Sequence, residues 1–397
     1  MERFLFTKLF MLIMITLVLQ MHGCKGCLEK ERIALLKIKA LIINASTVVV
    51  DDYNPTLESW IDDHNRTLES WVDNRASDCC GWYQVECNTT TGRVINLSLS
   101  RLLYRSTPIL NISLFQSFEE LQSLNLSSNY FEGCGDCRES LKQLKILDLG
   151  SNNFNSSILP YLTTLTSLKT LKLGGNNLGD FNTKQGAGLA NLRNLEDLDL
   201  SYNRINGTLQ ELESLKQLKI LDLGYNYFNS SILSYLTTLT SLRTLILRLN
   251  NLKDFNTKQG AELANLRKLE VLDLSYTRIS GSTLQELESL KQLKILDLGG
   301  NNFNSSILSY LTRLTSLRTL KLGGNNLGDL NTKQGAGLAN LKNLEVLDLS
   351  SNEINGTLQE LGLANLRNLE FLDLSDNYGL NGTLQELGNI YYDFTSN

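Results

Sequence analysis

A twelve-residue segment recurs unchanged through this chain and constrains its fold more than any other feature. The sequence ESLKQLKILDLG occupies Glu139–Gly150 and returns at Glu213–Gly224 and Glu288–Gly299. Each copy holds most of a shorter template, with leucine at positions 1, 4, 7 and 9 and asparagine at position 12. A fixed period of this kind predicts a solenoid in which each unit packs on its neighbours. The template begins at Phe118, Leu141, Leu165, Leu192, Leu215, Leu239, Leu266, Leu290, Leu314, Leu341 and Leu366.

The template has a physical explanation. In the Leu-x-Leu part, a short strand alternates, so Leu147 and Leu149 should face inward while Ile146 and Asp148 face outward. The asparagine amide can both donate and accept, and it can satisfy backbone groups where the chain leaves the strand. One unit cannot bury its own leucine face, so repetition builds the core. The pattern is that of leucine-rich repeats, and we expect an α/β solenoid, a right-handed horseshoe with a parallel concave sheet.

The chain begins like a secreted protein. Arg3 and Lys8 precede an apolar run, Leu9–Leu19, that is too short to cross a bilayer as a helix, so residues 1–23 are interpreted as a signal peptide. Seven cysteines suit the oxidising compartment that such a signal implies. Twelve N-x-[ST] sequons predict N-glycosylation at Asn44, Asn65, Asn88, Asn96, Asn111, Asn125, Asn155, Asn206, Asn229, Asn304, Asn355 and Asn381.

The segment ahead of the repeats carries a second signature. CLEKERIALL at Cys27–Leu36 and CCGWYQVEC at Cys79–Cys87 resemble the N-terminal cap of plant leucine-rich-repeat receptors and receptor-like proteins. The resemblance implies disulfides Cys27–Cys79 and Cys80–Cys87, which spacing alone does not select among three pairings. We therefore expect a disulfide-containing cap over residues 24–90 and repeats over residues 91–397, about eleven full units after a degenerate first one.

Two insertions are expected to be irregular. A nine-residue piece is doubled within the cap with an offset of eleven residues, at Thr56–His64 and Thr67–Arg75, and is interpreted as a spare loop. The stretch Gly179–Gly188 is interpreted as a loop on the convex side, since its glycine spacing matches no phosphate-binding loop.

Metal and catalytic sites find little support. Cys24 and Cys27 with Cys134 and Cys137 form two C-x-x-C pairs, which could bind zinc, but a local disulfide or free thiols are favoured because the cap claims Cys27. The two histidines, His22 and His64, build no catalytic triad with the repeats. We predict no enzyme activity and no cofactor.

A row of aspartates offers one further catalytic alternative. Paired carboxylates could act as a glycosidase, although a solvated face is the favoured interpretation because Leu-Asp-Leu is a common spelling of this strand. The row comprises Asp148, Asp199, Asp222, Asp273, Asp297, Asp348 and Asp373.

The resemblance also implies a function. Plant receptor-like proteins recognise a peptide, a protein or a cell-wall fragment in defence or development, and signal through a partner receptor kinase at the plasma membrane. The family usually adds a C-terminal cap and a membrane span, whereas this sequence ends in NIYYDFTSN within a repeat, so we expect a truncated form or a secreted decoy. The alternatives are a secreted inhibitor of cell-wall-degrading enzymes and a non-functional fragment. The net charge of −5 predicts no basic stripe and no nucleic-acid partner.

One strand segment differs in sequence from its two equivalents in the other blocks. LKLGGN at Leu171–Asn176 and Leu320–Asn325 becomes LILRLN at Leu245–Asn250. This change places Ile246 and Arg248 on the concave side and Leu249 at its rim, with tyrosines at the equivalent rim position of both neighbours. Drift of a redundant copy is the commoner origin of such a change, and a binding hot spot is the alternative. The candidate ligand-binding residues are Tyr225, Ile246, Arg248, Leu249 and Tyr276.

Overall fold

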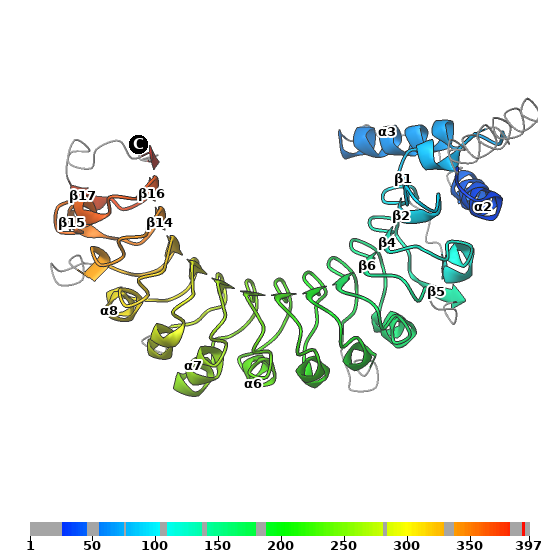
Figure 1. Cartoon of the computed structure of the whole chain (residues 1–397). Helices are drawn as coiled ribbons and strands as arrows, with labels where there is room; N and C mark the ends of the chain where they lie inside the picture. The colour runs from blue at the N-terminus through cyan, green and yellow to red at the C-terminus, as the bar shows by residue number, and fades with distance from the viewer. Residues whose placement is uncertain are drawn as a thin grey trace, which may run out of the picture.

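The chain folds into an open arc. The computed structural model describes residues 26–45, 55–74, 77–103, 109–136, 141–179, 188–280, 284–328, 337–381 and 391–393. Strands line the concave side of the arc, and helices such as α6, α7 and α8 line its convex side (Figure 1). The signal-peptide prediction for residues 1–23 lies outside the described residues. Within the described residues, no helix is long and apolar enough to cross a membrane.

A single fourteen-stranded sheet runs the length of the arc. Its first strand, β1 (Val85–Cys87), pairs antiparallel with β2, and every later neighbour pairs in parallel, which confirms the expected parallel concave sheet. One strand lies beyond the last template match, because Tyr391–Asp393 pairs with Phe371–Asp373. The parallel strands are β2 (Val94–Ser98), β4 (Ser123–Asn125), β6 (Ile146–Asp148), β7 (Thr170–Lys172), β8 (Asp197–Asp199), β9 (Ile220–Asp222), β10 (Thr244–Ile246), β11 (Val271–Asp273), β12 (Ile295–Asp297), β13 (Thr319–Lys321), β14 (Val346–Asp348), β16 (Phe371–Asp373) and β18 (Tyr391–Asp393).

The template leucines form one continuous core. Leu147 of β6 lies in register with Leu171 of β7, and Leu221 of β9 lies in register with Leu245 of β10. These side chains are almost entirely buried, as the alternation predicted. On the convex side, Phe131 and Phe154 stack with ring centroids 6.1 Å apart and extend the core outward. Because each leucine packs on the units before and after it, the core has no single centre.

Buried asparagines connect the repeats, as the template predicted. The side-chain amide of Asn226 donates to the carbonyls of Leu200, Leu223 and Gly224 at 2.9–3.1 Å. Its oxygen accepts from the backbone amides of Asn203 and Ile205 in the preceding repeat, at 3.2 and 2.8 Å. One asparagine therefore satisfies groups of two repeats at a bend where the sheet ladder has ended.

The convex side is built from short helices and two small sheets. The middle copy of the insert forms helix α7 (Thr257–Ala264), whose first turn is closed by a capping box between Asn256 and Gln259. The first copy was predicted to be a loop, and its residues 180–187 lie outside the described residues. The other convex elements are η2 (Ile112–Phe115), η3 (Ser156–Ile158), α4 (Leu159–Leu162), η4 (Leu189–Asn191), η5 (Gln210–Ser214), α6 (Ile232–Leu236), η6 (Gln285–Ser289), η7 (Ser305–Ile307), α8 (Leu308–Leu311), η8 (Leu363–Asn365), and the strand pairs β3 (Ile109–Asn111) with β5 (Gly133–Asp136) and β15 (Asn355–Thr357) with β17 (Gly379–Asn381).

The N-terminal cap contains α2 (Glu29–Ala45), α3 (Pro55–Ser70), η1 (Cys79–Gly81) and β1. The predicted spare loop is wrong, because most of the doubled piece forms helix α3. The second copy also supplies Trp71, which is fully buried and stacks on Trp82 with ring centroids 5.9 Å apart. Its indole N–H donates to the carbonyl of Tyr83 at 2.9 Å. The doubling therefore gives the cap a helix and part of its core.

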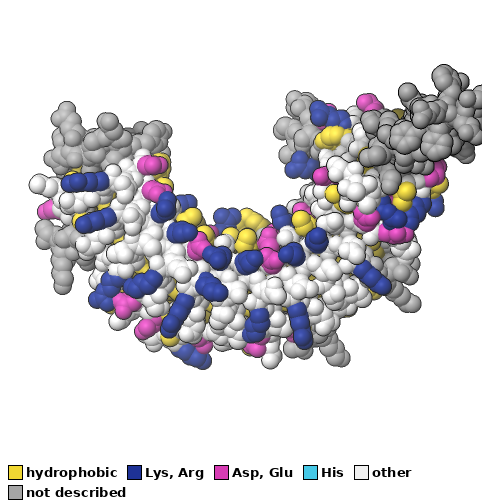
Figure 2. Space-filling model, in the orientation of Figure 1, with side chains coloured by type: hydrophobic (Ala, Val, Ile, Leu, Met, Phe, Trp, Pro, Cys, Tyr) yellow, Lys and Arg dark blue, Asp and Glu magenta, His cyan; other side chains and the backbone are white. Residues whose placement is uncertain are grey.

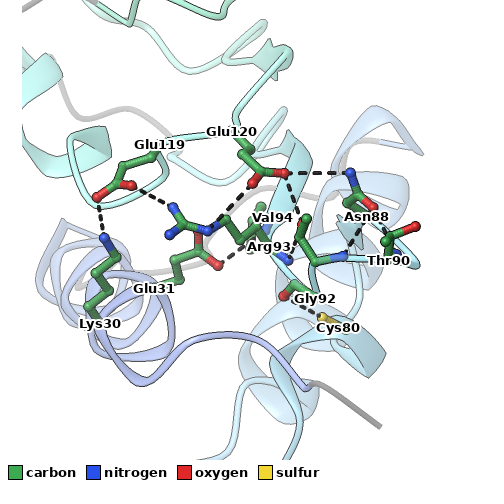
Figure 3. A network of polar contacts seen from close by, with 11 residues as sticks. Lys30, Glu31, Cys80, Asn88, Thr90, Gly92, Arg93, Val94, Glu119 and Glu120 are labelled. Carbon is green, nitrogen blue, oxygen red and sulfur yellow. Dashed lines mark hydrogen bonds and ion pairs between the residues drawn. The ribbon is translucent and has the colours of Figure 1, made fainter. Parts of the chain in front are cut away.

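An ionic network fastens the cap to the array. Glu119, at the second position of the first template unit, pairs with Lys30 of α2 and with Arg93, the latter at 2.6 Å. Glu120 pairs with Arg93 at 3.5 Å and accepts from the Thr91 hydroxyl at 2.9 Å (Figure 3). Hydrogen bonds from Lys30 and Arg93 lower the pKa of Glu119 to about 2. Glu119 thus joins the first template unit to α2 of the cap, and Glu120 joins it to the degenerate unit that follows the cap.

Candidate functional site

The backbone turns into the left-handed region directly after most strands of the large sheet. The residue at template position 11 of each repeat, directly before the position of the template asparagine, has this conformation. We call this row of residues the rim and the asparagines that follow it the ladder asparagines. Four consecutive rim residues at the centre of the array are bulky: Tyr202, Tyr225, Leu249 and Tyr276, with φ between 54° and 55°. Glycine occupies the preceding rim position, Gly175, and the two following ones, Gly300 and Gly324.

Large side chains are unfavourable at this backbone position. A left-handed conformation costs a non-glycine residue about 1–2 kcal/mol, and glycine adopts it without that cost. The rim also shows that glycine fits, because it stands there on both sides of the bulky run. Side chains retained at such a cost often mark functional sites, so we take the four residues as a candidate binding surface.

Two of the tyrosines and an arginine form a compact cluster. The rings of Tyr202 and Tyr225 stack with centroids 3.7 Å apart and planes 16° apart. The Arg248 guanidinium carbon lies 4.6 Å from the Tyr225 ring centroid, and the guanidinium donates to the Tyr202 hydroxyl at 3.3 Å. Stacking and cation–π contacts hold the three side chains together. The cluster is therefore organised before any ligand arrives.

Tyr276, the fourth bulky rim residue, lies against Gly300 of the next repeat. The Tyr276 ring lies so close to Gly300 that a Cβ on that glycine would stand 2.4 Å from ring carbons. Gly300 thus serves twice, by adopting φ +62° and by leaving room for the ring. Tyr276 remains 59 % exposed and extends the aromatic surface toward the next repeat.

A groove adjoins the cluster on the side of the earlier repeats. The small rim residue before Tyr202, Gly175, lines this groove together with Tyr202. The groove has a volume of about 1010 Å³. Its walls combine aromatic, amide and charged groups, including Asn153, Asn155, Asn177, Arg204, Tyr225 and Tyr227. A surface of this kind can stack on a ligand and hydrogen-bond to it.

The concave strands beside the rim carry the aspartate row. Each aspartate accepts a hydrogen bond from the amide two residues ahead, as Asp222 does from Gly224 at 2.8 Å and Asp148 from Gly150 at 2.9 Å. Ile246 interrupts the row, since its register partners on the two sides are Asp222 and Asp273. These bonds show that the aspartates cap backbone amides at the strand ends. A structural role for the row is therefore favoured over a glycosidase site.

Burial raises the pKa of two aspartates in the row, Asp222 and Asp297. For Asp222, loss of solvent, reinforced by the charges of Asp199 and Asp273, raises the pKa from an ordinary value of 3.8 to about 6, although the Gly224 amide and Arg248 oppose the shift. Between those two pH values the Asp222 carboxyl is ionised in the unfolded chain but still largely protonated in the folded one. Ionisation of the carboxyl therefore favours unfolding as the pH rises through this window, and the full penalty is present above pH 6.

We expect Asp222→Asn to stabilise the protein by roughly 1–2 kcal/mol at pH 7 and to have little effect at pH 4. The amide oxygen can still accept from Gly224, so only the charge is lost. Urea unfolding at the two pH values measures the difference. Asp148→Asn is the control, because Asp148 makes the same bond to Gly150 but has Lys172 beside it. Equal effects at pH 4 and pH 7 would contradict the argument.

The structure brings most of the predicted binding residues together. Tyr225, Arg248 and Leu249 lie in adjacent repeats, Ile246 lies on β10, and Tyr276 occupies the following rim position. Sequence comparison of the copies missed Tyr202, which completes the stacked cluster. The signal was present, because Tyr202 precedes Asn203 as Tyr225 precedes Asn226.

The two cap disulfides implied by the resemblance are present. The structure joins Cys27 to Cys79 and Cys80 to Cys87, and Cys134 is also disulfide-bonded, while Cys24 and Cys137 lie outside the described residues. In the described part of the chain, no three His, Cys, Asp or Glu side chains gather to hold a metal.

The sequons are all accessible. None of the twelve asparagines is buried. Asn96 and Asn125 lie on β2 and β4, whereas the strands of the large sheet from β6 onward carry no sequon. The concave surface beside the rim cluster would therefore stay free of its own glycans.

Comparisons with known proteins agree with this architecture. Residues 28–88 match the leucine rich repeat N-terminal domain, and residues 315–378 match a leucine rich repeat model. Further leucine rich repeat models match residues 143–165, 164–180, 191–208, 268–290 and 292–314. The cap and the array thus match separately.

The similar proteins include plant receptor-like proteins. Receptor like protein 21 of Arabidopsis thaliana is 41 % identical over 53 % of this chain and 21 % of its own length. Receptor-like protein 13 of the same plant is 38 % identical over 67 % of this chain and 25 % of its own length. The chain therefore spans about a fifth to a quarter of these relatives. A crystal structure of a TDR receptor superposes with a TM-score of 0.58, at 27 % identity, over 77 % of this chain and 56 % of that one.

Proposed function

The chain is a leucine-rich-repeat protein of the plant receptor-like type, and from that premise we propose that it binds an extracellular ligand at the central rim. The ligand would be a peptide, a protein or a cell-wall fragment recognised in defence or development. Signalling would pass through a partner receptor kinase, as the resemblance to plant receptor-like proteins implies. The proposed location is the cell surface or the space outside it.

The run of four bulky residues at a left-handed backbone position carries this proposal. Tyr, Arg and an exposed apolar residue are the composition of binding hot spots. The stacked Tyr202 and Tyr225 with Arg248 supply such a cluster in an ordered form, and ordering before binding reduces the entropy lost on association. The sequon-free concave strands beside the cluster support the same surface.

The rim can be tested by converting the bulky run to glycine. Tyr202→Gly, Tyr225→Gly, Leu249→Gly and Tyr276→Gly together give these repeats the residue that already stands at Gly175 and Gly300. Relief of backbone strain should offset the lost contacts, so we expect secretion and melting temperature to be nearly unchanged. Binding to members of an array of plant secreted peptides and cell-wall oligosaccharides should fall at least about tenfold.

The control keeps the backbone effect and leaves the cluster intact. Ser128→Gly with Ser351→Gly makes the same change at two rim positions far from the centre, both with positive φ. Array binding by this control should match the parent protein. A ligand bound equally well by the fourfold variant would overturn the assignment of the rim as the binding site.

A further inference from the structure

The edge of the arc that leads into each strand has a charge opposite to that of the whole protein. We call it the pre-strand edge and define it by template positions 2, 3 and 5 of the ten repeats that begin at Leu141 through Leu366. These positions hold fourteen Lys or Arg residues and four Glu, although the chain has a net charge of −5. Figure 2 shows dark blue side chains spread along the face of the arc nearest the viewer. The prediction that the chain has no basic stripe is therefore wrong.

The cations fall into two tiers, and the tier nearer the strands is largely neutralised. At position 5, Glu196 pairs with Lys169 at 2.9 Å and with Lys219 at 2.5 Å. Glu270 pairs in the same way with Arg243 and Lys294. Hydrogen bonds from these cations lower the pKa of Glu196 to about 2 and also lower that of Glu270. This tier therefore offers little free charge.

The outer tier, at position 2, is different. It carries Lys or Arg in seven repeats and threonine in the other three, with no acidic residue. All seven cations are exposed, and none forms an ion pair within the described residues. Lys216, for example, reaches only the carbonyl of Thr238 at 3.5 Å. Cations fixed along a rigid array add their fields, and so attract an anionic chain more strongly than scattered charges would.

The remaining position identifies the chemistry of the partner. Position 3 holds Gln, Asn or Ser in nine of the ten repeats, and none of the three positions holds an aromatic residue. Asn194, Asn343 and Asn368 each donate to a carbonyl of the preceding repeat at 2.9 Å, so it is as acceptors that these amides suit the hydroxyl groups of a sugar chain. Single-stranded nucleic acid, by contrast, is usually bound by aromatic side chains that stack on its bases.

We propose that the pre-strand edge binds an extended polyuronate, a polysaccharide with a carboxylate on each sugar. Carboxylates would pair with the outer-tier cations, and sugar hydroxyls would bond to the amides between them. This surface is separate from the rim, which lies at the other end of the strands, and the proposal does not depend on the function proposed for the rim.

The experiment uses the whole secreted chain and polygalacturonate oligomers of about ten to fifteen sugars as the probe. Neutralising Lys216→Gln, Arg267→Gln and Lys291→Gln removes three exposed cations of the outer tier. We expect affinity at about 0.15 M salt to fall at least about tenfold, and the dependence of affinity on salt to become less steep. The matched control, Lys253→Gln, Lys258→Gln and Arg278→Gln, makes the same change in charge away from this edge and should bind like the parent.

Three results would overturn the proposal. The first is no binding of the parent to polygalacturonate at low salt. The second is an equal loss in both triple variants, which would show that only net charge matters. The third is equal or tighter binding of a single-stranded oligonucleotide of similar charge. Fully methyl-esterified polymer should not bind, and the fourfold rim variant should bind polygalacturonate normally.

Discussion

Asn226→Ala is expected to lower the free energy of unfolding by roughly 2–6 kcal/mol, because it leaves buried backbone groups of two repeats without partners. The amides of Asn203 and Ile205 both donate to the Asn226 oxygen and would lose their acceptor. Each unsatisfied buried group costs about 1–3 kcal/mol. Urea unfolding measures the total, and hydrogen exchange should show the loss of protection concentrated around β8 and β9.

The chain contains a natural control for this result. Thr277 stands where the other repeats have asparagine, and its hydroxyl donates to the Leu274 carbonyl at 2.6 Å. Thr277→Asn should add a donation to the Leu247 carbonyl, equivalent to the bond that Asn226 makes to Leu200 of its preceding repeat, and should stabilise the protein by about 1 kcal/mol. If Asn226→Ala unfolds at the same urea concentration as the parent, the ladder does not have the role described above.

Trp71→Ala should destabilise the cap by about 3–5 kcal/mol, the usual range for removing a large buried aromatic side chain. Besides stacking on Trp82, the Trp71 indole donates to the backbone carbonyl of Tyr83 at 2.9 Å, and alanine removes both contacts. Its loss therefore weakens contacts among several cap elements. Hydrogen exchange should show α2 and β1 losing protection while strands β9 to β12 keep theirs, since a solenoid transmits strain mainly to its nearest neighbours.

A neighbouring residue provides the control for the cap. Val72 is 47 % exposed, so Val72→Ala should change stability little. Uniform loss of protection along the whole array in Trp71→Ala would show that the cap and the repeats unfold as one unit, contrary to this expectation.

The sequence predicted those features that the repeat period determines. Leu147, Leu171 and their equivalents were placed inward by strand alternation, and the ladder asparagines were placed at the bend. Resemblance supplied the two cap disulfides, which spacing could not select. These features depend on a local pattern or on a motif, and both can be read from the linear sequence.

Features that depend on contacts across repeats were harder to predict. Tyr202 lies 23 residues before Tyr225, and only the stacking of successive repeats brings their rings together. The pre-strand edge was hidden because a net charge sums over all faces of the molecule. Helix α7 was missed because the prediction rested on the first copy of its insert, in which Gly188 stands where the middle copy has Glu262; glycine is about 1 kcal/mol less favourable than alanine in a helix.

The acidic pair at the first repeat has a consequence for assembly. A chain with three nearly identical blocks risks docking its cap on the wrong block, since the leucine surfaces are alike. Glu119 and Glu120 attract Lys30 and Arg93, but the three blocks carry Lys142, Lys216 and Lys291 at the position of Glu119, and a lysine there would repel these cations. Charge at one edge position thus identifies the first repeat and guards a duplicated array against misregistered folding.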